Sequence, residues 1–148
     1  MEIELTSSDV WIVQTMIHSA GSNSTAALYD LICIGDVLNH AIFAPGELQY
    51  GLYKLYKMNV IEVDDAKFKL TENGKNKFKR LLSKKNALTK ENDEIKKILK
   101  AKIWIKNIEL PKYNDNLDPL MFSLDYFNNE CNRYINLANS IISNMRNN

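Results

Sequence analysis

The chain has 148 residues, 45% of them hydrophobic and 25% charged, which is enough for one domain with a core plus a helical extension. Its net charge of +1 excludes a protein that is basic over its whole surface. No apolar run reaches the roughly 20 residues that span a bilayer, and the start of the chain lacks a basic region and a cleavage site. We therefore expect a cytoplasmic protein with no membrane partner.

The charges are unevenly distributed along the chain. Residues 1–65 hold two lysines, Lys54 and Lys57, against nine acids, whereas residues 66–106 hold four acids and most of the lysines. A run of lysines on a helix is often only a solvated face. This stretch therefore indicates a nucleic-acid partner only together with a suitable fold.

Two apolar helices are expected in the first third of the chain. Thr6 and Asp9 have the spacing of a capping box, which predicts a helix over about 7–20. Apolar residues leave little polar surface on this helix, so we expect it to be covered on more than one side. A second core helix is expected over about 25–40. His18 has no partner motif and is interpreted as a local hydrogen-bonding residue.

No catalytic or metal-binding set is visible in the sequence. Asp36 and His40 lie four residues apart on one helix face, but catalysis also requires a pocket, a nucleophile or a metal. We instead expect Asp36 to reach His40 or the start of a neighbouring helix. Cys33 and Cys131 have no CxxC or Cys/His cluster beside them, which supports neither a disulfide nor zinc. The sequence predicts no enzyme, metal or cofactor.

A third helix is predicted over 45–58. Pro45 suits a first helical turn, and Glu47 adds negative charge at the positive helix end. Leucines recur on one face, at 48, 52 and 55, with Gly51 beside them where another segment could come close. That face is expected to be buried. The opposite face is expected to display Tyr50, Tyr53, Lys54 and Lys57, with Gln49 at its margin.

A β-hairpin is predicted directly after this helix. Asn59 accepts the left-handed conformation that ends many helices, and residues 60–63 have the composition of a strand. In the second strand, over 67–70, apolar residues alternate with Lys67 and Lys69, which are expected to face outward. Thr71 can cap the helix that follows.

The run LQYGLYKLYKMNVIEVDDAKFKLTENGK resembles the recognition helix, wing and following helix of PadR-like and MarR-like bacterial transcription regulators. Asn59-Val60-Ile61 stands where these families often have Gly-Leu-Ile, and Leu70-Thr71-Glu72-Asn73-Gly74 matches their Leu-Thr-Glu-x-Gly. The resemblance is clear over about 45–80 and looser back to about residue 7. It implies a mainly α fold with a small β-hairpin wing: a winged helix-turn-helix domain at 1–86 and a C-terminal helical extension at 87–148.

The extension begins with an amphipathic helix predicted over about 89–102, with an apolar face of Ile95, Ile98 and Leu99. The spacing over 103–110 suits a strand, a bent helix end or an extended packing segment. Prolines and Asn/Asp residues predict a loop over 111–119.

Apolar residues then alternate at spacings of four and three to the end of the chain, as in the seam of a coiled coil. The partner of this seam could lie in the same chain, on the 89–102 helix or the first helix. We favour a homodimer, because the resemblance implies dimerisation through terminal helices. The predicted interface residues are Leu120, Leu124, Phe127, Tyr134 and Ile141.

Two functions from different classes fit this sequence. The first is a DNA-binding regulator, in which Gln49, Tyr50 and Tyr53 approach base edges while Lys54, Lys57, Lys67 and Lys69 contact phosphates of double-stranded DNA. No Arg lies on these surfaces, although Arg makes the commonest specific base contact. The alternative is a winged-helix module that binds a protein through Tyr50, Tyr53 and Tyr56.

Overall fold

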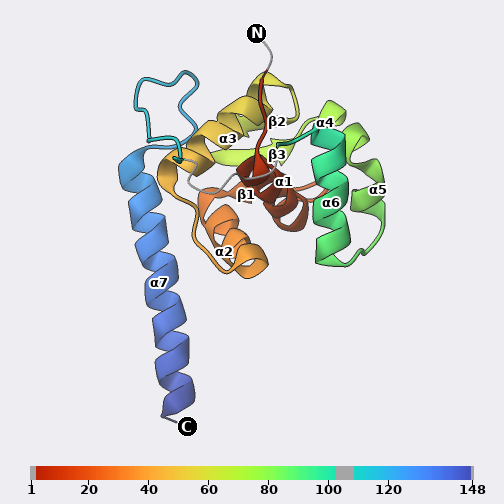
Figure 1. Ribbon diagram of the computed structural model, residues 1–148. Helices are drawn as coiled ribbons and strands as arrows, with labels where there is room; N and C mark the ends of the chain where they lie inside the picture. The colour runs from red at the N-terminus through yellow and green to blue at the C-terminus, as the bar shows by residue number, and fades with distance from the viewer. Residues whose placement is uncertain (1–2, 103–108, 148) are drawn as a thin grey trace.

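The computed structural model describes residues 3–102 and 109–147. This part of the chain is mostly helical and contains a small antiparallel sheet, as predicted (Figure 1). Its elements, in chain order, are α1 (Ser7–Ser19), β1 (Ala26–Ala27), α2 (Leu28–Asn39), α3 (Pro45–Lys57), β2 (Ile61–Asp64), β3 (Lys67–Leu70), α4 (Glu72–Lys77), α5 (Lys79–Ser83), α6 (Leu88–Leu99) and α7 (Leu124–Arg146).

The predicted hairpin is confirmed. Strands β2 and β3 pair antiparallel, with Val63 opposite Phe68, and Asp65 and Ala66 form the turn with positive φ angles of 50° and 56°. Two consecutive positive φ angles are typical of the tight turns that match strand twist. Phe68 is fully buried, whereas Lys67 on the same strand is exposed. The alternation in the sequence therefore identified the inner face correctly.

A third strand was not predicted. Strand β1 pairs with β3, giving the order β1-β3-β2. The sequence predicts that a helix starts near residue 25, but the chain remains extended through Ala27 before α2 begins. Two alanines carry no strand signal, because alanine is depleted in strands and two residues show no periodicity.

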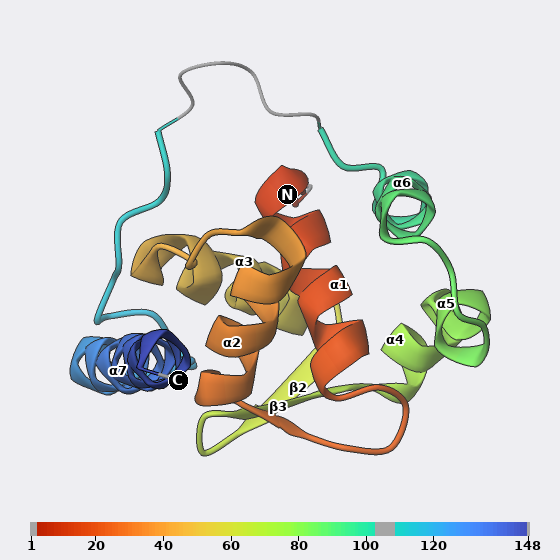
Figure 2. The ribbon, with the colours of Figure 1, turned by 90° about the horizontal axis from the view of Figure 1, so that it is seen from below.

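Helix α1 lies at the centre of the fold, as Figure 2 shows. Asp9 accepts a hydrogen bond from the backbone N–H of Thr6 at 2.7 Å, which is half of the predicted capping box. The expectation that α1 is covered on several sides is confirmed, and the cover comes from α2, α3, α6 and β3 of the same chain. Its side chains at 10, 12, 13 and 16 have no exposed surface.

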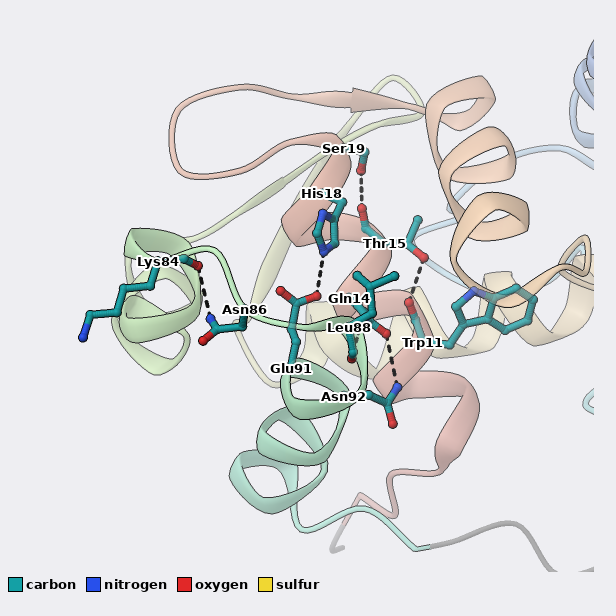
Figure 3. A network of polar contacts seen from close by, with 10 residues as sticks. All are labelled: Trp11, Gln14, Thr15, His18, Ser19, Lys84, Asn86, Leu88, Glu91 and Asn92. Carbon is teal, nitrogen blue, oxygen red and sulfur yellow. Dashed lines mark hydrogen bonds and ion pairs between the residues drawn. The ribbon is translucent and has the colours of Figure 1, made fainter.

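Helix α6 packs against the side of α1 that faces away from α7 (Figure 2). His18 Nε2 lies 2.6 Å from Glu91 Oε1, and the Gln14 amide donates to the carbonyl of Leu88 and accepts from Asn92 (Figure 3). His18 is a hydrogen-bonding residue, as interpreted, but its partner Glu91 lies 73 residues away, so the expectation of a local partner is wrong. The α6 segment, assigned from sequence to the extension, thus shares polar contacts with the core helix.

The helix predicted after Thr71 is broken at Phe78 into α4 and α5, although Thr71 caps its start by accepting from the N–H of Gly74 at 3.0 Å. The predicted loop over 111–119 has no regular helix or strand. Most of the ambiguous 103–110 segment lies outside the described residues.

Helix α7 begins beside α2 and extends past the body of the protein (Figure 1). Near its start, Phe127 stacks on Phe122 with ring centroids 5.4 Å apart. Further along, the hydroxyl of Tyr134 donates to Asp36 Oδ2 at 2.6 Å. The expected partners of Asp36, namely His40 or a helix start, were therefore wrong.

Candidate nucleic-acid interface

Local sequence explains why α3 forms and how it is oriented. Ala44 offers no capping side chain, but Glu47 accepts the backbone N–H of Ala44 at 3.1 Å and the hydroxyl of Ser8 at 2.5 Å. The predicted leucine face is confirmed, since the side chains at 48, 52 and 55 have no exposed surface. Gly51 allows the close contact with α1, because a Cβ there would displace the side-chain end of Ile12.

The prediction that Lys54 faces solvent is wrong. Its side chain is 9% exposed, and Nζ lies 2.6 Å from Asp9 Oδ2 and 3.3 Å from the carbonyl oxygen of Glu4. Lys54 sits at the border of the displayed face, where its long stem can follow α1 to the carboxylate. Among the described residues, Asp9 Oδ1 has no hydrogen-bond partner. Lys54 therefore neutralises a buried acid and is not a free phosphate contact.

Gln49 is also buried, with 1% of its surface exposed, so its predicted position near base edges is wrong. Its Nε2 donates to the carbonyl of Asn114 at 2.8 Å, and its Oε1 accepts the backbone N–H of Asn114 at 2.9 Å. The first residues of α3 are therefore covered by a segment from the predicted loop. The sequence analysis missed this contact, although Gly46 in the first helical turn was a signal that another backbone comes close.

The remaining predicted residues of α3 do lie at the surface. Tyr50 is 43% exposed, Tyr53 is half-buried and Lys57 is exposed. The rings of Tyr50 and Tyr53 stack with centroids 6.5 Å apart, and Lys57 Nζ lies 5.3 Å from the Tyr53 centroid. Tyr56 is 36% exposed at the same end of the helix. This surface combines aromatic rings with one accessible cation.

The hairpin carries both signs of charge. Lys67 is exposed, and Lys69 forms an exposed ion pair with Glu62 at 3.1 Å. An exposed pair of this kind is weak, so Lys69 can exchange its carboxylate for another anion. Asp64 and Asp65 are exposed at the turn. The hairpin is therefore a modest source of positive potential.

A second group of cations lies on α4 to α6, on the opposite side of the protein from α7 (Figure 2). Arg80 is engaged there in a two-point contact with Glu94, at 2.9 and 2.7 Å. This bond raises the pKa of Arg80 and lowers the pKa of Glu94. The exposed lysines are Lys77 on α4, Lys79 on α5, and Lys84 and Lys85 directly after α5.

The predicted dimer residues separate into two groups. Phe127 is 3% exposed and Tyr134 is bonded to Asp36, so both contribute to packing within one chain. Leu120, Leu124 and Ile141 are 42%, 37% and 52% exposed. Only the second group offers apolar surface to another molecule.

The described residues show no chemistry of a metal site. They contain no group of three or more His, Cys, Asp or Glu side chains that could hold a metal ion. Burial raises the pKa of the Cys33 and Cys131 thiols, which disfavours the reactive thiolate. The hydrogen bond to Asp36 raises the pKa of Tyr134 to about 12, so this hydroxyl keeps its proton near neutral pH.

No family profile matches the chain, and neither the curated proteins nor the solved structures include a match. None of the described helices is both long enough and apolar enough to cross a membrane.

Proposed function

We propose that this protein is a winged-helix transcription regulator that binds double-stranded DNA through α3 and the β2–β3 hairpin. The observation that carries this proposal is the order α1-β1-α2-α3-β2-β3 with β1 closing the sheet beside β3. In a helix-turn-helix arrangement the second helix of the pair enters the major groove. Here that helix is α3, and the hairpin follows it directly. The resemblance to PadR-like and MarR-like regulators points to the same class.

The proposed contacts are those predicted residues that remain accessible. Tyr50 and Tyr53 would lie against the groove, where base edges specify sequence, and Lys57, Lys67 and Lys69 would contact phosphates. Lys54 and Gln49 are left out because they are buried and bonded elsewhere. Three cations and no arginine predict modest affinity that depends strongly on salt.

We also propose that the protein acts as a homodimer through the C-terminal half of α7. Five large apolar side chains there are 41% to 73% exposed and fall on one side of the helix: Ile135, Leu137, Ile141, Ile142 and Met145. A two-fold arrangement of such helices would bury this face. It would also present two copies of α3 to one duplex, as operator half-sites require.

A second candidate function is a winged-helix module that binds a protein. It is favoured by the three tyrosines of α3, at 50, 53 and 56, which outnumber the single accessible lysine of that surface. Tyrosine is enriched in protein interfaces and lysine is depleted.

Titration of a fluorescent random duplex at several salt concentrations distinguishes these functions. A DNA-binding protein should lose affinity steeply with salt, and Lys57→Gln and Lys67→Gln should each lower the salt slope by roughly one. Lys90→Gln is the matched control, because Lys90 is exposed on α6, away from the proposed interface. A lower salt slope in Lys90→Gln, with no change in Lys57→Gln and Lys67→Gln, would instead place DNA on the α4 to α6 side. Absence of salt-dependent binding even at low salt would exclude the regulator and favour the protein-binding module.

A further inference from the structure

An extended segment, residues 109–114, lies on the first turns of α3, and we call it the strap. At Gly46 the two backbones are in direct contact, because a Cβ on this residue would overlap the carbonyl oxygen of Pro111. One turn later the side chain of Gln49 pairs with the backbone of Asn114 through both its donor and its acceptor, at 2.8 and 2.9 Å. The strap therefore follows α3 through specific backbone contacts. Figure 2 shows it passing along the outer side of this helix.

The strap occupies the same face of α3 that carries the proposed DNA contacts. Gly46 precedes Tyr53 by seven residues and Lys57 by eleven, spacings that return to the same side of a helix. Tyr53 and Lys57 remain accessible at the C-terminal end of this face, while its N-terminal end is covered. In helix-turn-helix proteins the N-terminal residues of the recognition helix contact base edges.

Few contacts hold the strap in place. Tyr113 donates its hydroxyl to the carbonyl of Phe122 at 2.8 Å, and most other strap residues, including Glu109, Pro111 and Lys112, are exposed. The hydrogen bonds of the strap to Gln49 and Phe122 are only partly buried, and apart from Tyr113 the strap buries little apolar surface. A segment of this kind opens at low free-energy cost. The strap can therefore leave α3 without unfolding the core beneath it.

We propose that the strap is an autoinhibitory cover that competes with double-stranded DNA for the N-terminal end of α3. This inference rests on the proposed function. With the strap bound, a duplex reaches only the outer part of the α3 face and the hairpin. With the strap released, the whole face is available. The gain in apparent affinity for DNA then equals one divided by the fraction of unmodified molecules in which the strap is already released.

Two substitutions release the strap by different routes. Gly46→Ala places a methyl group where the carbonyl of Pro111 now lies, and alanine is compatible with the first turn of a helix. Gln49→Leu removes both hydrogen bonds to Asn114 without changing the charge. Asn116→Ala is the control, because Asn116 is exposed just beyond the strap and its side chain makes no contact that holds α3.

Each variant is measured in two ways, by hydrogen exchange at the amide of Asn114 and by titration of a random duplex at low salt. We expect faster exchange in Gly46→Ala and Gln49→Leu, together with duplex affinity that is tighter by about fivefold or more. Asn116→Ala should match the unmodified protein in both. Faster exchange with unchanged duplex affinity would overturn the autoinhibitory role while leaving DNA binding intact. Unchanged exchange in both variants would show that the strap is a fixed part of the fold. Faster exchange without any duplex binding would reject the regulator function itself.

Discussion

Helices α6 and α7 are both amphipathic, yet the rest of the chain covers them to very different extents. On α6, Ile95 and Leu99 are buried and Glu91 is 2% exposed. On α7, Phe127 is the one buried residue of the described helix, and five large apolar side chains of the C-terminal half are exposed. An amphipathic pattern therefore shows that a face has an apolar character, but not that the same chain covers it. The tests that follow compare substitutions at covered and exposed sites of these two helices.

The largest effect is expected where α7 does pack on its own chain. Phe127→Asp places a charge in a 3% exposed site beside Phe122, and it should cost roughly 3 kcal/mol or more in free energy of unfolding. Chemical denaturation at low protein concentration measures this cost. Ile135→Asp is the matched control: it puts the same charge on the same helix at a 41% exposed site, so its cost should stay within about 0.5 kcal/mol. Equal costs for the two variants would mean that the rest of the chain covers residues 127 and 135 of α7 to the same extent.

A smaller effect is expected at the docking site of α6. His18→Ala should cost about 1–3 kcal/mol, because the Glu91 side chain, 3% exposed in the unmodified protein, loses its partner at 2.6 Å. The double variant His18→Ala/Glu91→Gln should recover part of this loss, since a neutral amide is less costly to bury than an ionised carboxylate. Denaturation curves for the single and double variants give the coupling energy. Additive costs would show that the two side chains contribute independently.

Residues of α2, α3 and β3 show which features of this protein could be predicted from its sequence. The buried leucines of α3 and the alternation in β3 were predicted, because each depends on periodicity within a few residues. Lys54 and Gln49 were misplaced, because their partners, Asp9 and Asn114, lie 45 and 65 residues away. A helical wheel gives the direction of a side chain but not which distant segment meets it. The same limit applied to Asp36, whose partner on α7 is 98 residues away.

A third effect concerns the single hydrogen bond between α2 and the middle of α7. Tyr134→Phe should cost about 1 kcal/mol. The contact should also depend on pH, since the bond to Asp36 raises the pKa of Tyr134 to about 12, above the unfolded value of about 10. The folded state thus holds this proton more tightly, so the stabilisation is complete below pH 10 and disappears as the pH rises to about 12. Phenolate absorbance in the unmodified protein and in Tyr134→Phe measures the titration. A Tyr134 that ionises near its unfolded value would show that the bond is not maintained.

The smallest effect on folding is expected at the exposed end of α7. A substitution there should instead weaken the association of two copies of the chain. Ile141 is 52% exposed, so Ile141→Asp should change the free energy of unfolding of the monomer by no more than about 0.5 kcal/mol. If this face joins two copies, the symmetric interface receives two opposed like charges, and association should weaken by about tenfold or more. Light scattering over a concentration series measures this. Asn136→Asp is the control, since Asn136 is exposed on the other side of the helix and gains the same charge without a change in size. If Ile141→Asp and Asn136→Asp weaken the dimer equally, the interface does not lie on the apolar face of α7. If the unmodified protein remains monomeric at the highest concentrations, the exposed face of α7 does not join two copies of this chain. A molecule other than a second copy would then have to cover this face.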